Sequence, residues 1–346
     1  MALRQLVAIF VAGWLVFGGA AWGGTEESMP SARQEADGAR VRVLGDDGQA
    51  VEAGGLPAEL IRAKRLLAEG EAKEAQEAAQ EWLEENEGAA YADQAYWVIA
   101  QGLYDRGRYY QAFEKYEELL DGSPGTELFE ASLRQEMEIG QLFLAGKKRL
   151  VWGFIPASAK TEGLEILDRV IDRWPGSEMA AEALMIQAEH YFAGGRFVEA
   201  QSTYQVLVES YSKSRFYQDA LLRNAEATHG QYAGPGYDAS CLTDARIRYE
   251  QYRARFPGHA GEIGIGPRIA RIDWQLAQKH WVIADFYERT GRQGAARYYY
   301  EYVMSHWPDT EWAVRAGQRY AEPASDGQRI DNPEGAGLEP GKGGGG

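Results

Sequence analysis

Cysteine is nearly absent from this sequence, and its scarcity excludes one class of fold. Cys241 is the single cysteine among 346 residues, so the chain cannot be held together by an internal disulfide. No histidine or second cysteine stands near it in a metal-ligand pattern, and free cysteine usually packs as a small apolar residue. We therefore expect Cys241 to be a packing residue, with a reactive thiol as the alternative.

Basic residues are also in short supply. The chain has 36 Lys and Arg against 52 Asp and Glu, which gives a formal net charge of −16. Binding to nucleic acid depends on clustered basic side chains that release counterions from phosphates. The balance therefore predicts no nucleic-acid partner. We interpret the acidity as a source of solubility for a protein outside the cytoplasm.

Long apolar runs are missing except at the N-terminus. Arg4 precedes an apolar run over residues 6–17, and small residues follow it. This order is typical of a secretory signal, and the run is too short to span a membrane comfortably. We predict a signal peptide over residues 1–23, cleaved after Gly23, and an exported periplasmic protein. The alternative is an uncleaved N-terminal anchor.

The motifs of common enzymes are missing as well. None of the five histidines stands in an HExxH-like spacing, and neither a glycine-rich phosphate loop nor a GxSxG motif occurs. We therefore predict no catalytic residue, no cofactor, no metal site and no enzymatic activity. An enzyme acting on cell-wall glycans is the alternative, because catalytic groups can converge without a local motif.

A short phrase recurs along the chain: an aromatic ring, a proline, then a small or acidic residue. It reads RWPGS at 173–177, RFPGH at 255–259 and HWPDT at 306–310. Proline cannot continue a helix, and it biases the preceding residue away from helical angles. A following Ser, Thr or Asp is a good N-cap. Each phrase therefore predicts the end of one helix and the start of the next.

A weaker form of the phrase, DGSPGT, stands at 121–126, and a proline-free form, ESYSKS, stands at 209–214. Small residues lie at fixed distances before these two predicted helix ends and before the one at 306–310. Alanine lies 24 and 12 residues before Pro124, Ser212 and Pro308, and tyrosine lies eight residues before each. A glycine-containing turn separates two amphipathic stretches within each unit, and the unit repeats at about 34 residues. This pattern resembles the tetratricopeptide repeat. We expect an all-α tetratricopeptide-repeat solenoid of about six helix-turn-helix units over residues 57–320, with twelve or thirteen helices and no sheet.

The segments that flank the repeats have a different composition. Residues 24–56 are polar and glycine-rich without helical periodicity, so we predict a flexible leader. Residues 321–346 carry proline, glycine and charge and end in GKGGGG, so we predict a disordered glycine-rich tail.

The last unit carries a more specific likeness. Its matching residues are Ala284, Asp285, Tyr287, Arg289 and Gly291, followed by Val303, Trp307, Pro308, Asp309 and Thr310. Residues 271–316 as a whole resemble the closing repeat of the BamD family. These are periplasmic lipoproteins of the machinery that inserts β-barrel proteins into bacterial outer membranes.

The resemblance implies a non-catalytic scaffold at the inner face of the outer membrane. It implies that the C-terminal repeats, with Arg289, contact a β-barrel assembly protein, and that an N-terminal groove takes unfolded outer-membrane protein segments. The lipidated cysteine of the family has no counterpart at residues 20–25, which leaves anchoring open and favours peripheral contact with the membrane. The alternative is a periplasmic repeat protein that coordinates cell-wall or Tol–Pal-type processes.

Solenoids of this type present a concave groove lined by the first helix of each unit. Rings with interleaved polar groups suit an extended peptide, and Glu182 belongs to this face. The expected groove residues are Trp97, Gln101, Tyr104, Met185, Glu189, Phe192, Trp281, Asp285 and Arg289. Alternatively, the tryptophans and the methionine pack in the core.

Two insertions interrupt the repeats, at 145–161 and 229–240. The first holds a basic cluster, Lys147, Lys148 and Arg149, and then Trp152 and Phe154. Charge beside aromatic rings suits a membrane surface or an acidic partner. A loop packed on the solenoid is the alternative. The second insertion has turn chemistry and predicts no particular role.

Overall fold

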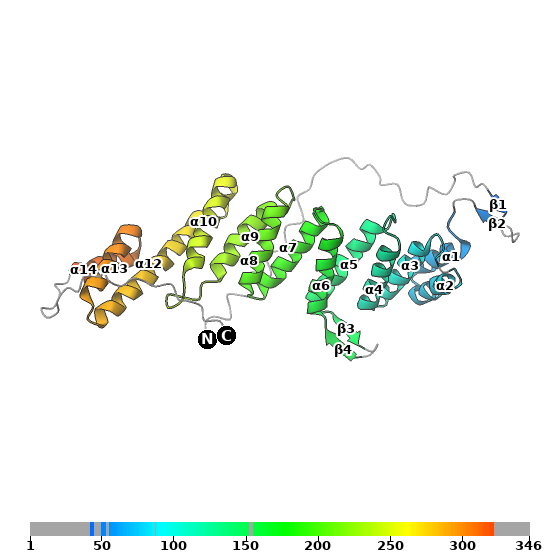
Figure 1. Ribbon diagram of the computed structural model, residues 1–346, viewed down its shortest axis with the longest axis horizontal. Helices are drawn as coiled ribbons and strands as arrows, with labels where there is room; N and C mark the ends of the chain where they lie inside the picture. The colour runs from blue at the N-terminus through cyan, green and yellow to red at the C-terminus, as the bar shows by residue number, and fades with distance from the viewer. Residues whose placement is uncertain (1–41, 45–49, 53–54, 87, 152–154, 322–346) are drawn as a thin grey trace, which may run out of the picture. The chain divides into compact units, whose positions relative to one another are not determined.

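A computed structural model describes residues 42–44, 50–52, 55–86, 88–151 and 155–321. The chain divides into two units, residues 1–57 and 58–346 (Figure 1). In the first unit, β1 (Arg42–Leu44) pairs antiparallel with β2 (Ala50–Glu52). A short hairpin therefore lies within the predicted flexible leader. The predicted signal peptide and the tail from residue 322 onward lie outside the described residues.

The second unit is built from helix pairs, which confirms the predicted all-α solenoid of six helix-turn-helix units. We call the first helix of each pair helix A and the second helix B. The pairs are α1 (Ala58–Ala68) with α2 (Ala72–Glu85), α3 (Ala92–Asp105) with α4 (Tyr109–Gly122), α5 (Phe129–Leu144) with α6 (Lys160–Arg173), α7 (Glu178–Ala193) with α8 (Phe197–Ser210), α9 (Tyr217–Gly230) with α10 (Ser240–Arg255), and α12 (Ile265–Arg289) with α13 (Gln293–His306).

Two further helices lie outside these pairs, so the described residues form fourteen helices rather than twelve or thirteen. Pro257 is the first residue of α11 (Pro257–Glu262), a position whose backbone N–H makes no hydrogen bond within the helix. The proline that ends α10 therefore also begins a short helix. The last helix, α14 (Glu311–Ala321), packs on α13 and α12. None of the helices in the described part of the chain is both long and apolar enough to cross a membrane.

Helices A and B of a pair touch at small residues, as predicted. The six alanines that the repeat spacing places at the contact are all fully buried: Ala100, Ala112, Ala188, Ala200, Ala284 and Ala296. In the third pair the contact is made by Gly140 and Gly163, and a Cβ on Gly163 would lie 2.9 Å from the carbonyl oxygen of Gly140. A larger side chain at any of these positions would force the two helices apart.

A buried tyrosine of helix B packs beside this contact in three of the pairs. Tyr116, Tyr204 and Tyr300 are the tyrosines that the sequence places eight residues before a stop, and all three are buried. Burying one large side chain of this kind stabilises the fold by about 1.5–3 kcal/mol. The Tyr116 hydroxyl accepts a hydrogen bond from Gln101 Nε2 at 2.7 Å, so its polar end is satisfied from helix A.

The insertion at 145–161 forms a second hairpin, which corrects the expectation of a sheet-free chain. Strand β3 (Lys148–Val151) pairs antiparallel with β4 (Ile155–Ser158) just before α6 (Figure 1). The Arg149 guanidinium forms an ion pair with Glu162 at 3.0 Å and lies 5.2 Å from the Tyr110 ring of α4. Strands of three or four residues are too short to give a readable alternation in the sequence.

Two side chains with reactive chemistry have packing roles, and for Cys241 this is the role that the sequence predicts. Cys241 packs against the buried cluster around Leu242, and burial raises the pKa of its thiol. His280 lies among the rings of Tyr299, Tyr302 and Trp307, with ring centroids 4.8–6.1 Å away. Burial lowers the pKa of His280, so the neutral imidazole is favoured.

One buried acid lies in the core between α4, α5 and α6. Glu136 is fully buried, and no donor group among the residues described is hydrogen-bonded to its carboxylate oxygens. Burial and the neighbouring Glu117 carboxylate raise the pKa of Glu136 well above its ordinary value. Arg173 opposes this shift, but it is already held by Glu117 and Asp121, each at 2.8 Å.

The glycine contact predicts opposite results for two Gly→Ala substitutions. Gly163→Ala should lower the free energy of unfolding by about 1–2 kcal/mol, because a backbone clash outweighs the ~1 kcal/mol gained in helix propensity. Gly294→Ala on α13 should raise it by up to about 1 kcal/mol, since a Cβ there meets nothing within 4 Å. Denaturant unfolding followed by circular dichroism measures both. Equal stabilisation by the two substitutions would contradict the contact.

Glu136 predicts a pH-dependent stability difference. Because its pKa is raised by folding, the wild-type protein loses stability as the pH rises from the ordinary value of 4.5 through the folded-state pKa. Glu136→Gln removes this titration, so the variant should be more stable than wild type at neutral pH and lose that advantage toward acid pH. Thermal melts across the pH range test this, with Glu165→Gln on the exposed face of α6 as the control. A difference that is constant with pH would contradict the assignment.

Candidate functional site: a polar pocket between the third and fourth helix pairs

The predicted groove residues of the second pair are half-buried and engaged by their neighbours. The Trp97 ring lies edge-on to the Tyr116 ring, with centroids 5.6 Å apart, and Gln101 donates to the Tyr116 hydroxyl. The Tyr104 hydroxyl donates to Glu138 Oε1 of α5 at 2.6 Å. Burial and Glu138 raise the pKa of Tyr104, so this residue connects two helix pairs as a neutral donor.

Two of the predicted residues of the fourth pair, Glu189 and Phe192, meet at one arginine. Arg223 of α9 forms an ion pair with Glu189 at 3.0 Å, and its guanidinium lies 5.4 Å from the Phe192 ring. Arg223 also pairs with Glu226 at 2.8 Å, and Glu226 in turn pairs with Arg268 of α12. Glu189, Arg223, Glu226 and Arg268 thus form a chain of charges across three consecutive A helices. We call it the inner charge chain.

The predicted residues of the last pair lie on α12. Trp281 packs on the Trp312 ring of α14, with centroids 5.3 Å apart. Asp285 forms an ion pair with Arg289 at 2.9 Å, and the Arg289 side chain is 68% exposed. The nine predicted residues therefore lie in three separate groups, and Trp97, Met185 and Trp281 all pack against buried clusters. Their role in partner binding stays a prediction.

Of the second predicted site, the structure describes the basic cluster alone. Lys147 and Lys148 are exposed at the start of β3, while Arg149 is held against the solenoid. Trp152 and Phe154 lie outside the described residues. The hairpin is therefore packed on the solenoid through one of its three basic residues and presents the other two to solvent.

The described residues enclose an open pocket of about 440 Å³ where α6 ends and α7 begins. We call it the WPGS pocket, after the sequence of residues 174–177, which line it. Its lining residues come from the first two turns of α5 and α7, from the connection between α6 and α7, and from the turn before α9. They are Glu130, Arg134, Trp174, Pro175, Gly176, Ser177, Glu178, Met179, Glu182 and Arg215.

The helix stop that the sequence repeats is the part of the chain that shapes this pocket. Gly176 has a φ of +79°, which glycine adopts without strain. Ser177 caps α7, because its side-chain oxygen accepts a hydrogen bond from Ala180 N at 3.0 Å. The Trp174 ring is 37% exposed and is supported edge-on by Phe129 of α5 at 5.6 Å. The turn thus fixes one partly open aromatic ring beside a helix N-terminus.

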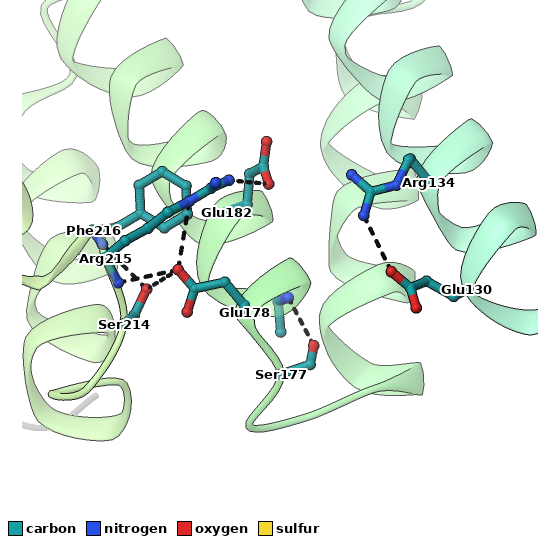
Figure 2. A network of polar contacts seen from close by, with 9 residues as sticks. Glu130, Arg134, Ser177, Glu178, Glu182, Ser214, Arg215 and Phe216 are labelled. Atoms are coloured by element: carbon teal, nitrogen blue, oxygen red, sulfur yellow. Dashed lines mark hydrogen bonds and ion pairs between the residues drawn. The ribbon is translucent and has the colours of Figure 1, made fainter. Parts of the chain in front are cut away.

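Three carboxylates and two guanidinium groups line the same pocket as that ring. Arg134 pairs with Glu130 on α5 at 3.2 Å, and Arg215 pairs with Glu182 at 2.9 Å and Glu178 at 3.5 Å. Figure 2 shows Glu178 and Glu182 on α7 turned toward Arg215, with the Glu130–Arg134 pair across the gap on α5. Exposed pairs of this kind contribute about 0–1 kcal/mol each, so a ligand can exchange their partners at little cost.

Glu178 has a second role, because it joins the fourth pair to the fifth. Its Oε1 accepts hydrogen bonds from Ser214 Oγ at 2.9 Å and from Arg215 N at 3.1 Å (Figure 2). A smaller hollow of about 280 Å³ lies next to this connection and shares Gly176, Ser177 and Glu178 with the WPGS pocket. An extended chain segment can therefore follow both hollows along the starts of the A helices.

Part of this pocket could be read from the sequence. The repeat spacing predicts Glu182 on the groove face, and Arg134 occupies the same place on α5, six residues before the small contact residue of its helix. Applying one rule to both helices finds both residues. Trp174 and Ser177 were recognised only as parts of a helix stop, and no repeating pattern points to Arg215.

Comparisons with known proteins support the repeat. The family model described as a tetratricopeptide repeat matches residues 182–214, which lie in the fourth pair and the turn that follows it. No curated protein matches the chain.

Two of the solved structures to which the chain is similar are bacterial repeat proteins. The C-terminal part of a repeat-containing protein from Cytophaga hutchinsonii is 13% identical, with 75% of this chain and 86% of that one covered, and a TM-score of 0.35. A tetratricopeptide repeat protein from Parabacteroides merdae is 10% identical, with 75% and 96% covered, and a TM-score of 0.34. At this distance they carry no argument about function.

The N-cap predicts a local loss of stability. Ser177→Ala should lower the free energy of unfolding by about 1 kcal/mol, because α7 loses its capping acceptor. Ser202→Ala on α8 is the matched control, since its hydroxyl only bonds back to the helix carbonyl of Val198. Denaturant unfolding and amide exchange at Ala180 measure the effect. Equal losses for the two substitutions would contradict the assignment of Ser177 as the cap.

Proposed function

We propose that the protein is a non-catalytic scaffold that binds an extended segment of another protein along the inner face of its A helices. The observation that carries this proposal is the WPGS pocket, which lies where the A helices α5 and α7 begin and combines a fixed ring with exchangeable ion pairs. Rings supply contact area at low entropic cost, and polar groups pair with the backbone of an extended partner. Helical repeat solenoids use their inner surfaces in this way.

We further propose that the scaffold works in the bacterial envelope and assists the assembly of β-barrel proteins into the outer membrane. The signal-like residues 1–23 support export, and the likeness of residues 271–316 to the closing repeat of the BamD family supports this role. Arg289, at the end of α12, is exposed, and within the described part of the chain its ion pair is with Asp285 of the same helix. It is therefore free to meet a β-barrel assembly protein without disturbing the core.

Capture from the native envelope tests this proposal. Tagged protein lacking residues 1–23 should recover, at near-equal amount, an outer-membrane β-barrel protein with attached soluble domains. Arg289→Glu should reduce that recovery severalfold, because it reverses the charge at the proposed contact. Arg255→Glu makes the same change at another exposed helix end, on α10, and should not affect recovery. Mass spectrometry of the bound fraction gives the ratios.

The other outcomes of this experiment are equally informative. Recovery of cell-wall enzymes or Tol-type proteins without a β-barrel protein would contradict the assembly role and favour the coordinating scaffold. Equal losses for Arg289→Glu and Arg255→Glu would show that overall charge, and not the end of α12, governs the contact.

A further inference from the structure

We propose that the WPGS pocket seats a lysine or arginine side chain of the extended partner segment. This inference rests on the proposed function and specifies the chemistry of the bound segment. It starts from the balance of charge in the pocket, where three carboxylates face two guanidinium groups. The chain as a whole carries a net charge of −16, so the field around the pocket also favours a cationic partner.

The carboxylates of the pocket differ in how firmly they are held. Glu178 is fixed by Ser214 and the Arg215 backbone and acts as a structural tie. Glu130 and Glu182 make only ion pairs, and their side chains are 61% and 27% exposed. An incoming cation can bind to the Glu130 and Glu182 carboxylates without breaking the hydrogen bonds by which Glu178 holds the turn before α9. An anion would have to compete with these carboxylates for Arg134 and Arg215.

The Trp174 ring supplies the second part of the site. Phe129 supports it edge-on, which leaves part of the ring open to the pocket. Elsewhere this protein repeatedly places a guanidinium over a ring, as Arg215 does over Phe216 at 4.6 Å and Arg271 over Trp274 at 4.5 Å. No cation of the described residues lies over Trp174 in this way. A cation above an indole ring is the most favourable form of this interaction.

The size of the pocket fits one long side chain together with its backbone. A volume of about 440 Å³ is near the lower end of the 300–1,000 Å³ range of ligand pockets. Neighbouring helices pack about 8–10 Å apart, and an extended chain advances about 3.3 Å per residue. About one residue in three of the bound segment can therefore direct its side chain toward each successive A helix. The neighbouring hollow is lined in part by Ser210 and Ser212, whose hydroxyl groups can pair with the backbone that continues past the pocket.

Peptide binding by the protein lacking residues 1–23 tests the inference. The probes are fluorescein-labelled peptides of about nine residues with a Ser, Thr and Val host sequence. The central residue is Lys, Met or Glu, so that Met preserves the length of the side chain without its charge. Fluorescence polarisation should show that the Lys peptide binds about tenfold more tightly than the Met peptide, and that the Glu peptide binds more weakly still. High salt should reduce the preference for Lys.

Variants of the pocket should move this preference in both directions. Glu130→Gln with Glu182→Gln should abolish it, and Trp174→Leu should reduce it more than Trp174→Phe, which keeps a ring. Arg134→Gln should increase it, because Glu130 is then left without its partner. Glu165→Gln, on the exposed face of α6 outside the pocket, removes one charge as a matched control and should leave the preference unchanged.

The outcomes separate this inference from the proposed function. If the Lys, Met and Glu peptides bind equally, the inference is overturned and the peptide-binding function stands. If Glu165→Gln removes as much preference as the pocket variants, the long-range field and not the pocket is responsible, which also overturns it. If no peptide binds, both the inference and peptide binding at the inner face are contradicted, while capture from the envelope still decides whether the protein is a scaffold.

Discussion

The close approach of two helices at a pair of small residues is the constraint on which the rest of the structure depends. At Ala188 and Ala200, and at Gly140 and Gly163, no side chain larger than a methyl group stands between the two helices. This close contact fixes how each helix A packs on its helix B, and so it fixes which face of helix A is turned away from helix B. Because the same contact recurs from pair to pair, the first turns of consecutive A helices come to lie next to one another. The WPGS pocket forms there, at residues that take no part in the contact.

Hydrogen bonds and ion pairs between neighbouring helix pairs are the second feature that organises the structure. Glu178 bonds to the turn before α9, Tyr104 donates to Glu138, and the inner charge chain links α7, α9 and α12. Many arginines of this acidic protein are engaged in such ties. The inner surface therefore offers carboxylates and rings more readily than unpaired cations. That balance, and not the net charge alone, sets which partner chemistry the surface favours.

The helix pairs can be predicted from the sequence because the patterns that mark them are local. Alanines at fixed distances from a stop, a tyrosine eight residues before it and a glycine turn each act within one helix pair. The repeat spacing places the three groups around Trp97, Glu189 and Trp281 on the A helices. It does not show which of these side chains are covered by a neighbouring helix pair, because that depends on contacts between pairs. The β3–β4 hairpin was missed because four-residue strands give no readable alternation. Arg215 reaches the pocket from the next pair, and such a long-range contact leaves no local pattern.

Site-specific photocrosslinking in living cells would test most directly the claim that the inner face of the A helices binds a partner chain. A photoreactive phenylalanine analogue replaces Glu182, which lines the WPGS pocket from α7, or Val206, which is exposed on α8 of the same pair. The account predicts crosslinks to another protein from position 182 and few from position 206. Crosslinks from position 206 with none from position 182 would contradict it and would place the binding surface on the B helices.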